Sequence, residues 1–242
     1  MKASTPSLIL FFVTSVLAVI FKMFGHNTLV FYTEPIIIPS VFIYYLVSNN
    51  LKITFLKALI FLLFFVREVF DALYISESPL GSFSCVLAVY VLLLFFALKD
   101  FRNLKISYRD GLSIFILIFG ITAICYSVLN LKLENLDLDF SLYVAFGIIL
   151  SIFSIVSILN YIKNSSYAFF NAMLMCICFI ITDIFFVLYK FYFYNYVFTL
   201  ISIVTQFLSY FFMVNYFLEK DKVTQDLNEN WYFLRWFLLV SK

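Results

Sequence analysis

The sequence predicts an all-α fold: a polytopic membrane protein with a bundle of eight transmembrane helices and a short interfacial helix at the C-terminus. Hydrophobic residues make up 64% of the 242-residue chain and charged residues only 12%, which is far below the charged fraction of a soluble domain. The apolar runs are continuous and reach about the 20 residues that a membrane-spanning helix needs. A transmembrane β-barrel would instead show alternating polarity in segments of about ten residues.

Eight apolar runs, each bounded by charged or turn-rich stretches, define the predicted helices. They lie at residues 7–24, 31–48, 53–75, 80–98, 112–130, 140–160, 168–189 and 196–217. The segments between them are short, so helices that are neighbours in sequence are expected to pack antiparallel. We therefore expect one transmembrane domain, residues 1–218, followed by a tail, residues 219–242.

The two ends of the chain each carry an apolar run that has more than one interpretation. Lys2 and the run from Leu8 to Phe21 look like a signal peptide, but no A-x-A cleavage pattern follows, so we expect a retained first helix. The run Trp231–Val240 is too short to span a bilayer. It combines two Trp, a Tyr and Arg235 with apolar residues. This pattern predicts a helix that lies in the membrane interface and anchors the tail.

Basic residues predict the orientation of the bundle. With the N-terminus inside, twelve of them fall on the cytoplasmic side: Lys2, Lys52, Lys57, Lys99, Arg102, Lys105, Arg109, Lys163, Lys220, Lys222, Arg235 and Lys242. Lys22, Lys132 and Lys190 fall on the other side. Because cytoplasmic loops are enriched in Lys and Arg, we expect both termini in the cytoplasm, at the inner or plasma membrane if the source is bacterial.

Four ionisable residues lie well inside predicted helices, where charge is costly and is usually functional. Arg67, Glu68 and Asp71 belong to the third helix, and Asp183 belongs to the seventh. Both helices run outward in the predicted topology. Asp71 is then roughly 6 Å of helix rise from the outer end, and Asp183 roughly 10 Å. The two carboxylates are therefore expected at similar depths in the outer half of the bilayer.

These charges also have a purely structural interpretation. Arg67 and Asp71 are spaced i,i+4 and can neutralise each other on one helix. Asp183 is harder to explain in this way, because Lys190, its nearest basic residue, is almost two turns away and its neighbours are apolar. A function is therefore favoured for Asp183, whereas the third helix remains open to both interpretations.

Other polar residues are candidates for the same pocket. Gln206 lies in the eighth helix, and Glu34 lies at the outer start of the second, where Thr33 or Glu34 alternatively caps the helix. His26, the single histidine, is expected in an outer loop as a solvated side chain rather than a ligand. The chain has no G-x-S-x-G, H-E-x-x-H, P-loop or G-x-G-x-x-G motif. We therefore expect no metal and no cofactor.

Partners follow from composition and charge. A net charge of +2 is too small to indicate nucleic-acid binding. The expected partner is therefore the bilayer itself, and the pattern favours no particular oligomeric state.

Along nearly the whole chain, several motifs resemble those of the YhhN family of membrane proteins, which includes lysoplasmalogenases. The similar segments are Thr33-Glu34-Pro35-x3-Pro39, the run that ends in Asp71, Phe83 with Tyr90, Phe179-Ile180-Ile181-Thr182-Asp183, and Thr205-Gln206. The chain also departs from the family pattern. Glu34 stands where the family usually has Lys, Phe70 replaces a Gly, Arg67 replaces a small residue, and Leu87 replaces a His.

The resemblance implies eight transmembrane helices and hydrolysis of the vinyl ether bond of lysoplasmalogen, or of a related single-chain ether lipid. It thereby implies a lipid substrate or ligand as a partner. It implies that Asp71 and Asp183 form the catalytic carboxylate pair. One would donate a proton to the vinyl carbon while the other stabilises the resulting cation. The supporting pocket would contain Glu68, Arg67, Gln206, Glu34, Tyr90 and Thr182.

Two alternatives belong to other classes. The departures at Glu34, Phe70 and Leu87 are compatible with a catalytically inactive lipid-binding or lipid-sensing protein of the same fold. A small transporter would use Asp71 and Asp183 as proton or cation sites. The sequence shows no inverted repeat and no Gly/Pro-broken helix pair, which are typical of many transporters.

Overall fold

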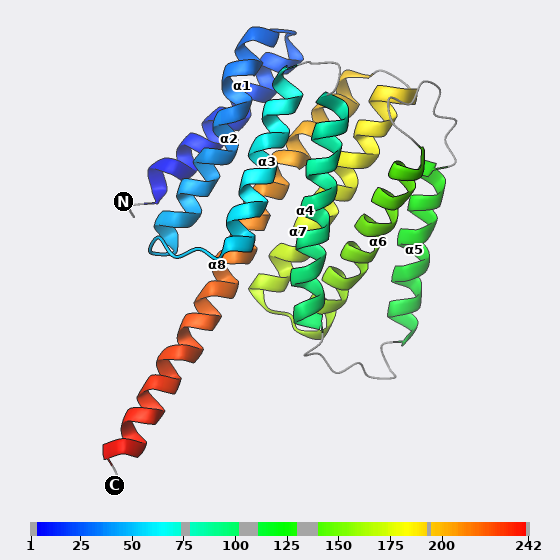
Figure 1. The fold of residues 1–242 in the computed structure, drawn as a ribbon. Helices are drawn as coiled ribbons and strands as arrows, with labels where there is room; N and C mark the ends of the chain where they lie inside the picture. Colours follow the sequence, from blue (N-terminus) through cyan, green and yellow to red (C-terminus); the bar gives the residue numbers. More distant parts are fainter. Residues whose placement is uncertain (1–3, 74–77, 102–110, 130–139, 193–194, 241–242) are drawn as a thin grey trace.

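The computed structural model describes residues 4–73, 78–101, 111–129, 140–192 and 195–240 and is all-α over these ranges (Figure 1). Its elements are α1 Thr5–Met23, α2 Asn27–Ser48, α3 Phe55–Leu73, α4 Ser78–Phe101, α5 Gly111–Leu129, α6 Phe140–Lys163, α7 Tyr167–Val187, a π-helical turn η2 Leu188–Tyr192, and α8 Tyr196–Val240. The predicted all-α class and the predicted order of eight helices are confirmed over these ranges, whereas the crossing of the membrane by all eight stays a prediction.

Within the part of the chain that the structure describes, six helices are long and apolar enough to cross a membrane. These segments are Thr5–Met23, Thr28–Ser48, Leu80–Phe101, Phe140–Lys163, Tyr167–Tyr192 and Tyr196–Val223. α5 contains a shorter apolar stretch, Ile114–Val128. α3 has a comparable length but carries four charged residues, Lys57, Arg67, Glu68 and Asp71. The chain is therefore a multi-pass integral membrane protein.

Short turns reverse the chain between neighbouring helices. In the α1–α2 turn, Gly25 has a φ of 71°, a left-handed conformation that glycine adopts without strain. The backbone N–H of His26 closes this turn by donating to the carbonyl of Phe21 at 2.9 Å. In the α6–α7 turn, the hydroxyl of Ser166 caps α7 by accepting from the backbone N–H of Phe169. These turns stack the helices side by side.

The helices form one bundle, but α4 and α5 depart from the expected packing of sequence neighbours. α1 packs with α2, α2 with α3, α3 with α4, α6 with α7, and α7 with α8. α4 packs with α6, and α5 lies against the other side of α6 (Figure 1). The expectation that all sequence neighbours pack together is therefore wrong at this step. The connection between α4 and α5 includes residues 102–110, outside the described ranges.

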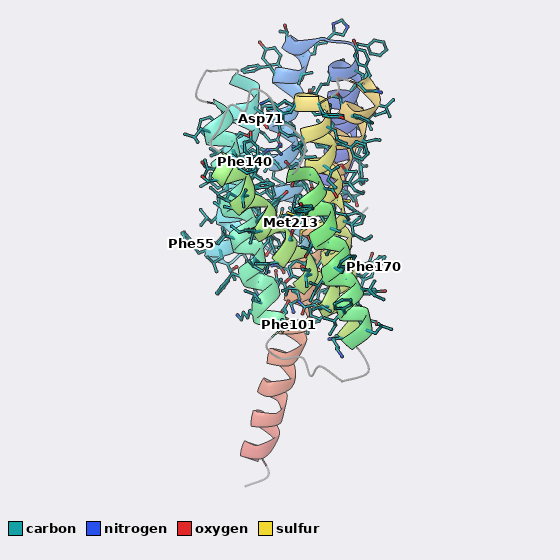
Figure 2. The ribbon with its side chains drawn as sticks, turned by 90° about the vertical axis from the view of Figure 1, so that its right-hand side faces the viewer. Phe55, Asp71, Phe101, Phe140, Phe170 and Met213 are labelled. Atoms are coloured by element: carbon teal, nitrogen blue, oxygen red, sulfur yellow. The ribbon has the colours of Figure 1, made fainter. Side chains whose placement is uncertain are left out.

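The two ends of the bundle are distinguished by their turns. We call the end that carries the α1–α2 turn the upper end, and the end that carries the α2–α3 turn the lower end (Figure 1). α1 begins at the lower end, and α8 leaves the bundle there. Both chain ends therefore lie on one side, as an even number of antiparallel helices requires. Figure 2 shows Asp71 near the upper end and Phe101 at the lower end.

α8 continues unbroken to Val240, well beyond the bundle (Figure 1). This corrects the prediction of a separate short C-terminal helix, because the segment Trp231–Val240 is the last part of α8. Its predicted place in the membrane interface stays a prediction.

A polar cluster fixes α8 at the lower end, and we call it the lower anchor. The Asp221 carboxylate accepts from Lys57 Nζ at 2.6 Å, from the Tyr45 hydroxyl at 2.7 Å and from Asn49 Nδ2 at 2.9 Å. One acidic residue of α8 therefore holds both α2 and α3.

A second acidic contact ties α8 to α4. Asp100 accepts from Lys220 Nζ at 2.7 Å and from the Tyr216 hydroxyl at 3.0 Å. The two contacts together position α8 against three other helices.

Candidate functional site

A cavity of about 510 Å³ occupies the upper half of the bundle. Every α-helix contributes to its wall, from the C-terminal halves of α1, α3, α5 and α7 and the N-terminal halves of α2, α4, α6 and α8. Such a volume is typical of small-molecule sites. The antiparallel order of the helices explains its position, because these eight half-helices meet at the upper end.

Seven of the eight residues predicted for the site line this one cavity. They are Asp71, Asp183, Glu68, Arg67, Gln206, Glu34 and Thr182. The eighth, Tyr90, is fully buried behind the wall and donates from its hydroxyl to Asp183. The structure therefore brings all eight predicted residues together. Asp71 and Asp183, which were predicted at similar depths in the bilayer, line the same cavity.

Glu68 is the most heavily bonded carboxylate of the cavity. It is buried and accepts from the Tyr210 hydroxyl at 2.5 Å, from Gln206 Nε2 at 2.8 Å and from Arg67 Nη1 at 3.4 Å. Hydrogen bonds of this kind, with an ionised partner, are about twice as strong as neutral ones. We call Arg67, Glu68, Gln206 and Tyr210 the α3–α8 network.

Arg67 connects this network to Asp71. Its Nη1 donates to the Tyr210 hydroxyl at 2.8 Å, and its Nη2 lies 3.3 Å from both Gln206 Oε1 and Asp71 Oδ2. The predicted i,i+4 pair of Arg67 and Asp71 is therefore present. Arg67 also contacts Glu68, so one guanidinium contacts both carboxylates of α3. The residues of the predicted structural pair therefore also line the cavity.

Asp183 is held by a different helix. The Tyr90 hydroxyl of α4 donates to its Oδ2 at 2.8 Å. The Tyr90 ring packs against Phe179, one turn earlier in α7, with ring centroids 4.9 Å apart. Asp183 therefore lines the same cavity as the charged residues of α3, and no ion pair of Asp183 occurs among the described contacts.

Small hydroxyl residues join α7 to α8 beside Asp183. The hydroxyl of Thr182 lies 2.8 Å from that of Thr205, and Ser202 donates to the Thr182 carbonyl at 3.0 Å. These contacts fix the α7 turn that carries Asp183 relative to the α8 turn that carries Gln206.

Glu34 has a different role from the helix cap that was one of its predicted interpretations. α2 begins at Asn27, so Glu34 lies within the helix and Pro35 follows it inside the helix. Its Oε1 accepts from Lys22 Nζ of α1 at 2.9 Å, and both side chains line the cavity. The capping interpretation is therefore wrong. His26 is exposed at the start of α2, away from the cavity wall.

Three residues that the sequence did not single out belong to the site. Lys22 was assigned only to the outer charge count, Tyr210 was not considered, and Tyr189 of η2 also lines the cavity. Tyr210 carries a recognisable signal, because it lies one turn after Gln206 and shares its helix face. Lys22 could not be recognised from the sequence, because its partner Glu34 lies on another helix.

Charged side chains are unevenly distributed around the cavity wall, to which α7 and α8 also contribute apolar residues. Its charged groups come from α1, α2, α3, α7 and η2, with Gln206 from α8. The part formed by α4, α5 and α6 is mainly apolar: Phe83, Val86, Ile121, Ile124, Val128, Phe146 and Leu150.

No group of three His, Cys, Asp or Glu side chains that could hold a metal ion occurs among the described residues. The polar groups of the site on which its chemistry can be argued are its carboxylates, its Lys and Arg side chains and the hydroxyls around them.

No family model, curated protein or solved structure matches this chain. The resemblance to the YhhN family consequently rests on the sequence motifs alone.

Proposed function

We propose that this protein is a YhhN-like integral membrane hydrolase that cleaves the vinyl ether bond of lysoplasmalogen or a related single-chain ether lipid. The observation that carries the proposal is the single cavity that contains Asp71, Asp183 and Arg67 within a membrane-embedded bundle. In this proposal all eight helices cross the bilayer, both termini are cytoplasmic, and the cavity lies in the outer half.

The division of the wall supports a lipid rather than a polar metabolite. A single-chain lipid has a charged or zwitterionic head and one hydrocarbon tail. The charged side of the cavity offers Lys22 and Arg67 to a phosphate, and the α4–α6 side offers apolar contacts to the tail. The vinyl ether joins head to tail and would therefore lie where the two sides meet.

The chemistry requires an acid and a carboxylate. We assign the carboxylate to Asp71, which is paired with Arg67, and the acid to Asp183, whose described partner is the neutral hydroxyl of Tyr90. Asp183 donates its proton to the vinyl carbon distant from the ether oxygen, which leaves an oxocarbenium ion that Asp71 stabilises.

Water then completes the reaction. It adds to the carbon bonded to the ether oxygen and returns a proton to the site. The resulting hemiacetal breaks its bond to the glycerol oxygen, which leaves as an alcohol, and the former vinyl group becomes a fatty aldehyde. One water is consumed, and the enzyme is restored.

The test is aldehyde release from lysoplasmalogen by the purified protein in lipid nanodiscs. We expect D71N and D183N each to lower kcat by about 10²–10⁴-fold, the range for loss of a proton-transferring group. E219Q is the control, because Glu219 is a carboxylate of α8 at the lower end, paired with Lys222. Activity that survives either Asp substitution would rule out the mechanism.

A second candidate, a lipid-binding or lipid-sensing protein without turnover, is favoured by one observation. The α3–α8 network engages Glu68 with three donors, which suits a fixed scaffold as well as a reacting site. This candidate predicts that lysolipid raises the melting temperature of the protein while no aldehyde forms. The absence of both effects would exclude both functions.

A further inference from the structure

α5 occupies an unusual place in the bundle. It packs against α6, and the buried core cluster contains none of its described residues. Among the α5 side chains that the structure describes, Ile121 alone is buried. Nevertheless, Ile121, Ile124, Cys125 and Val128 line the cavity. α5 is therefore a wall of the cavity without being part of the core that holds the other helices together.

The opposite edge of this wall belongs to α4. Ser82, Phe83 and Val86 of α4 line the cavity, yet the extensive contacts of α4 are with α3 and α6. α6 lies between α4 and α5 and forms the back of the apolar side with Phe146 and Leu150. Over the described residues α4 and α5 do not pack extensively against each other, and each of them packs against α6.

We propose that the hydrocarbon chain of a single-chain lipid enters the cavity from the bilayer between α4 and α5 and lies against α5. This inference rests on the proposed function for the chemistry of the head group. The position of the chain rests on the apolar wall alone. Ile124, Cys125 and Val128 would then determine which chains are accepted.

Energetics favours this route over an aqueous one. A hydrocarbon chain that passes from lipid to an apolar protein wall is never exposed to water. Exposure to water would cost about 0.8 kcal/mol per CH₂, which corresponds to roughly a fourfold loss in affinity. Because lipid tails are as apolar as the wall, transfer between them has little hydrophobic driving force. Selection among chains must therefore come from shape, and one chain suits the cavity volume better than two.

The experiment uses the full chain in nanodiscs and two photoactivatable lysolipids. One carries a diazirine at the end of its chain, and the other carries it beside the glycerol. Mass spectrometry then locates the labelled residues. We expect the chain-end probe to label residues 121–128 of α5 and the glycerol probe to label α3 or α8 near Arg67 and Gln206. Excess unlabelled lysolipid should abolish both signals.

Substitutions on α5 make the test specific. I124W or C125W places bulk in the apolar side and should lower chain-end labelling by about tenfold, because overfilled space excludes the chain. I116W is the matched control, since Ile116 is 61% exposed and lies outside the cavity wall. Retained labelling by the glycerol probe shows that each variant is folded.

The outcomes separate this inference from the proposed function. Equal labelling of the outward-facing Phe115 and Phe119, without competition, would mean that the probe reports only surrounding lipid and would overturn the inference. Competed labelling of residues 121–128 without aldehyde release would retain the chain site and reject the hydrolase. Aldehyde release without labelling of residues 121–128 would retain the hydrolase and reject the chain site.

Discussion

Arg67 is the residue on which the charges of the cavity depend. It contacts Glu68 and Asp71 on its own helix and Gln206 and Tyr210 on α8. Its Nε is buried without a hydrogen-bond partner among the described residues, so its two terminal nitrogens make all the described contacts. A guanidinium is suited to this position because it presents donors in a rigid fork and remains charged.

Replacing Arg67 tests how strongly Glu68 depends on it. We expect R67M to lower the free energy of unfolding by about 3–5 kcal/mol, because removal of one partner leaves a buried charge uncompensated. The double variant R67M/E68Q should recover most of the loss, since it removes the buried charge of Glu68, while Asp71, whose side chain is 36% exposed, remains partly solvated. Chemical denaturation in detergent micelles measures both values.

The control for this prediction is K222M, which breaks the exposed pair of Lys222 and Glu219. Surface pairs contribute little, so this variant should unfold like the original protein. A double variant no more stable than R67M would show that Arg67 acts mainly through packing or through its α8 contacts.

Whether a contact between two side chains could be predicted from the sequence depended on whether both residues lie on the same helix. Arg67 and Asp71 were predictable as a pair because the helix fixes their separation. The pairing of Glu34 with Lys22, and of Asp183 with Tyr90, depends on which helices are neighbours and how they are rotated. Hydropathy gives neither, so those contacts could not be predicted.

Among the elements, α3 shows how a charged helix is accommodated in this bundle. Its two basic and two acidic residues balance in formal charge. Near its start, Lys57 pairs with Asp221, and near its end Arg67 serves Glu68 and Asp71. α3 is thus anchored at both ends by α8, which explains how a helix with four charges stays inside the bundle.

The lower anchor makes a prediction about α2 and α3. We expect D221N to weaken the contacts of Lys57, Tyr45 and Asn49, since all three side chains donate to the Asp221 carboxylate. Hydrogen exchange at residues 49–54, in the α2–α3 turn, should then accelerate, because local opening becomes easier. Exchange in the upper halves of the helices should remain unchanged.

E219Q is again the matched control, since it alters the charge of α8 near the same level without touching the lower anchor. Equal acceleration in both variants would mean that the charge of α8, rather than the Asp221 contacts, holds the turn closed.

α8 also explains an error in the predicted elements. Apolarity ends near Leu218, where Glu219, Lys220, Asp221 and Lys222 follow. These residues are compatible with a helix, and Glu and Lys are good helix formers, so the membrane segment ends there while the helix continues. The change in polarity therefore marks the end of the apolar segment, but it does not predict the residue at which the helix ends.

At the scale of the whole molecule, the bundle places its charges at two levels. The cavity lies in the upper half, and the lower anchor ties α2, α3 and α8 at the opposite end. The apolar runs were sufficient to predict eight helices and their alternating directions. They could not predict that α5 lies outside α6, because a hydropathy pattern contains no information on lateral order.

Orientation of the bundle in the membrane can be tested with single cysteines. In a background that lacks Cys85, Cys125, Cys176 and Cys178, H26C marks the upper end and S165C marks the lower end, both at exposed positions. We expect a membrane-impermeant maleimide to label H26C in intact cells and S165C only after permeabilisation, because basic residues favour the cytoplasmic side.

Parent protein without the added cysteines provides the baseline. The reverse labelling pattern would place the cavity in the cytoplasmic half and would require its lipid to come from the inner leaflet.

The continuous α8 has a consequence for the lengths that this chain can tolerate. Tyr210 in the α3–α8 network and Asp221 in the lower anchor are about three turns apart and nearly in phase on one helix face. A single residue inserted or removed between them would rotate one relative to the other by about 100°. Either the α3–α8 network or the lower anchor would then lose its partners. The number of residues between Tyr210 and Asp221 is therefore as important for these contacts as the identity of the side chains.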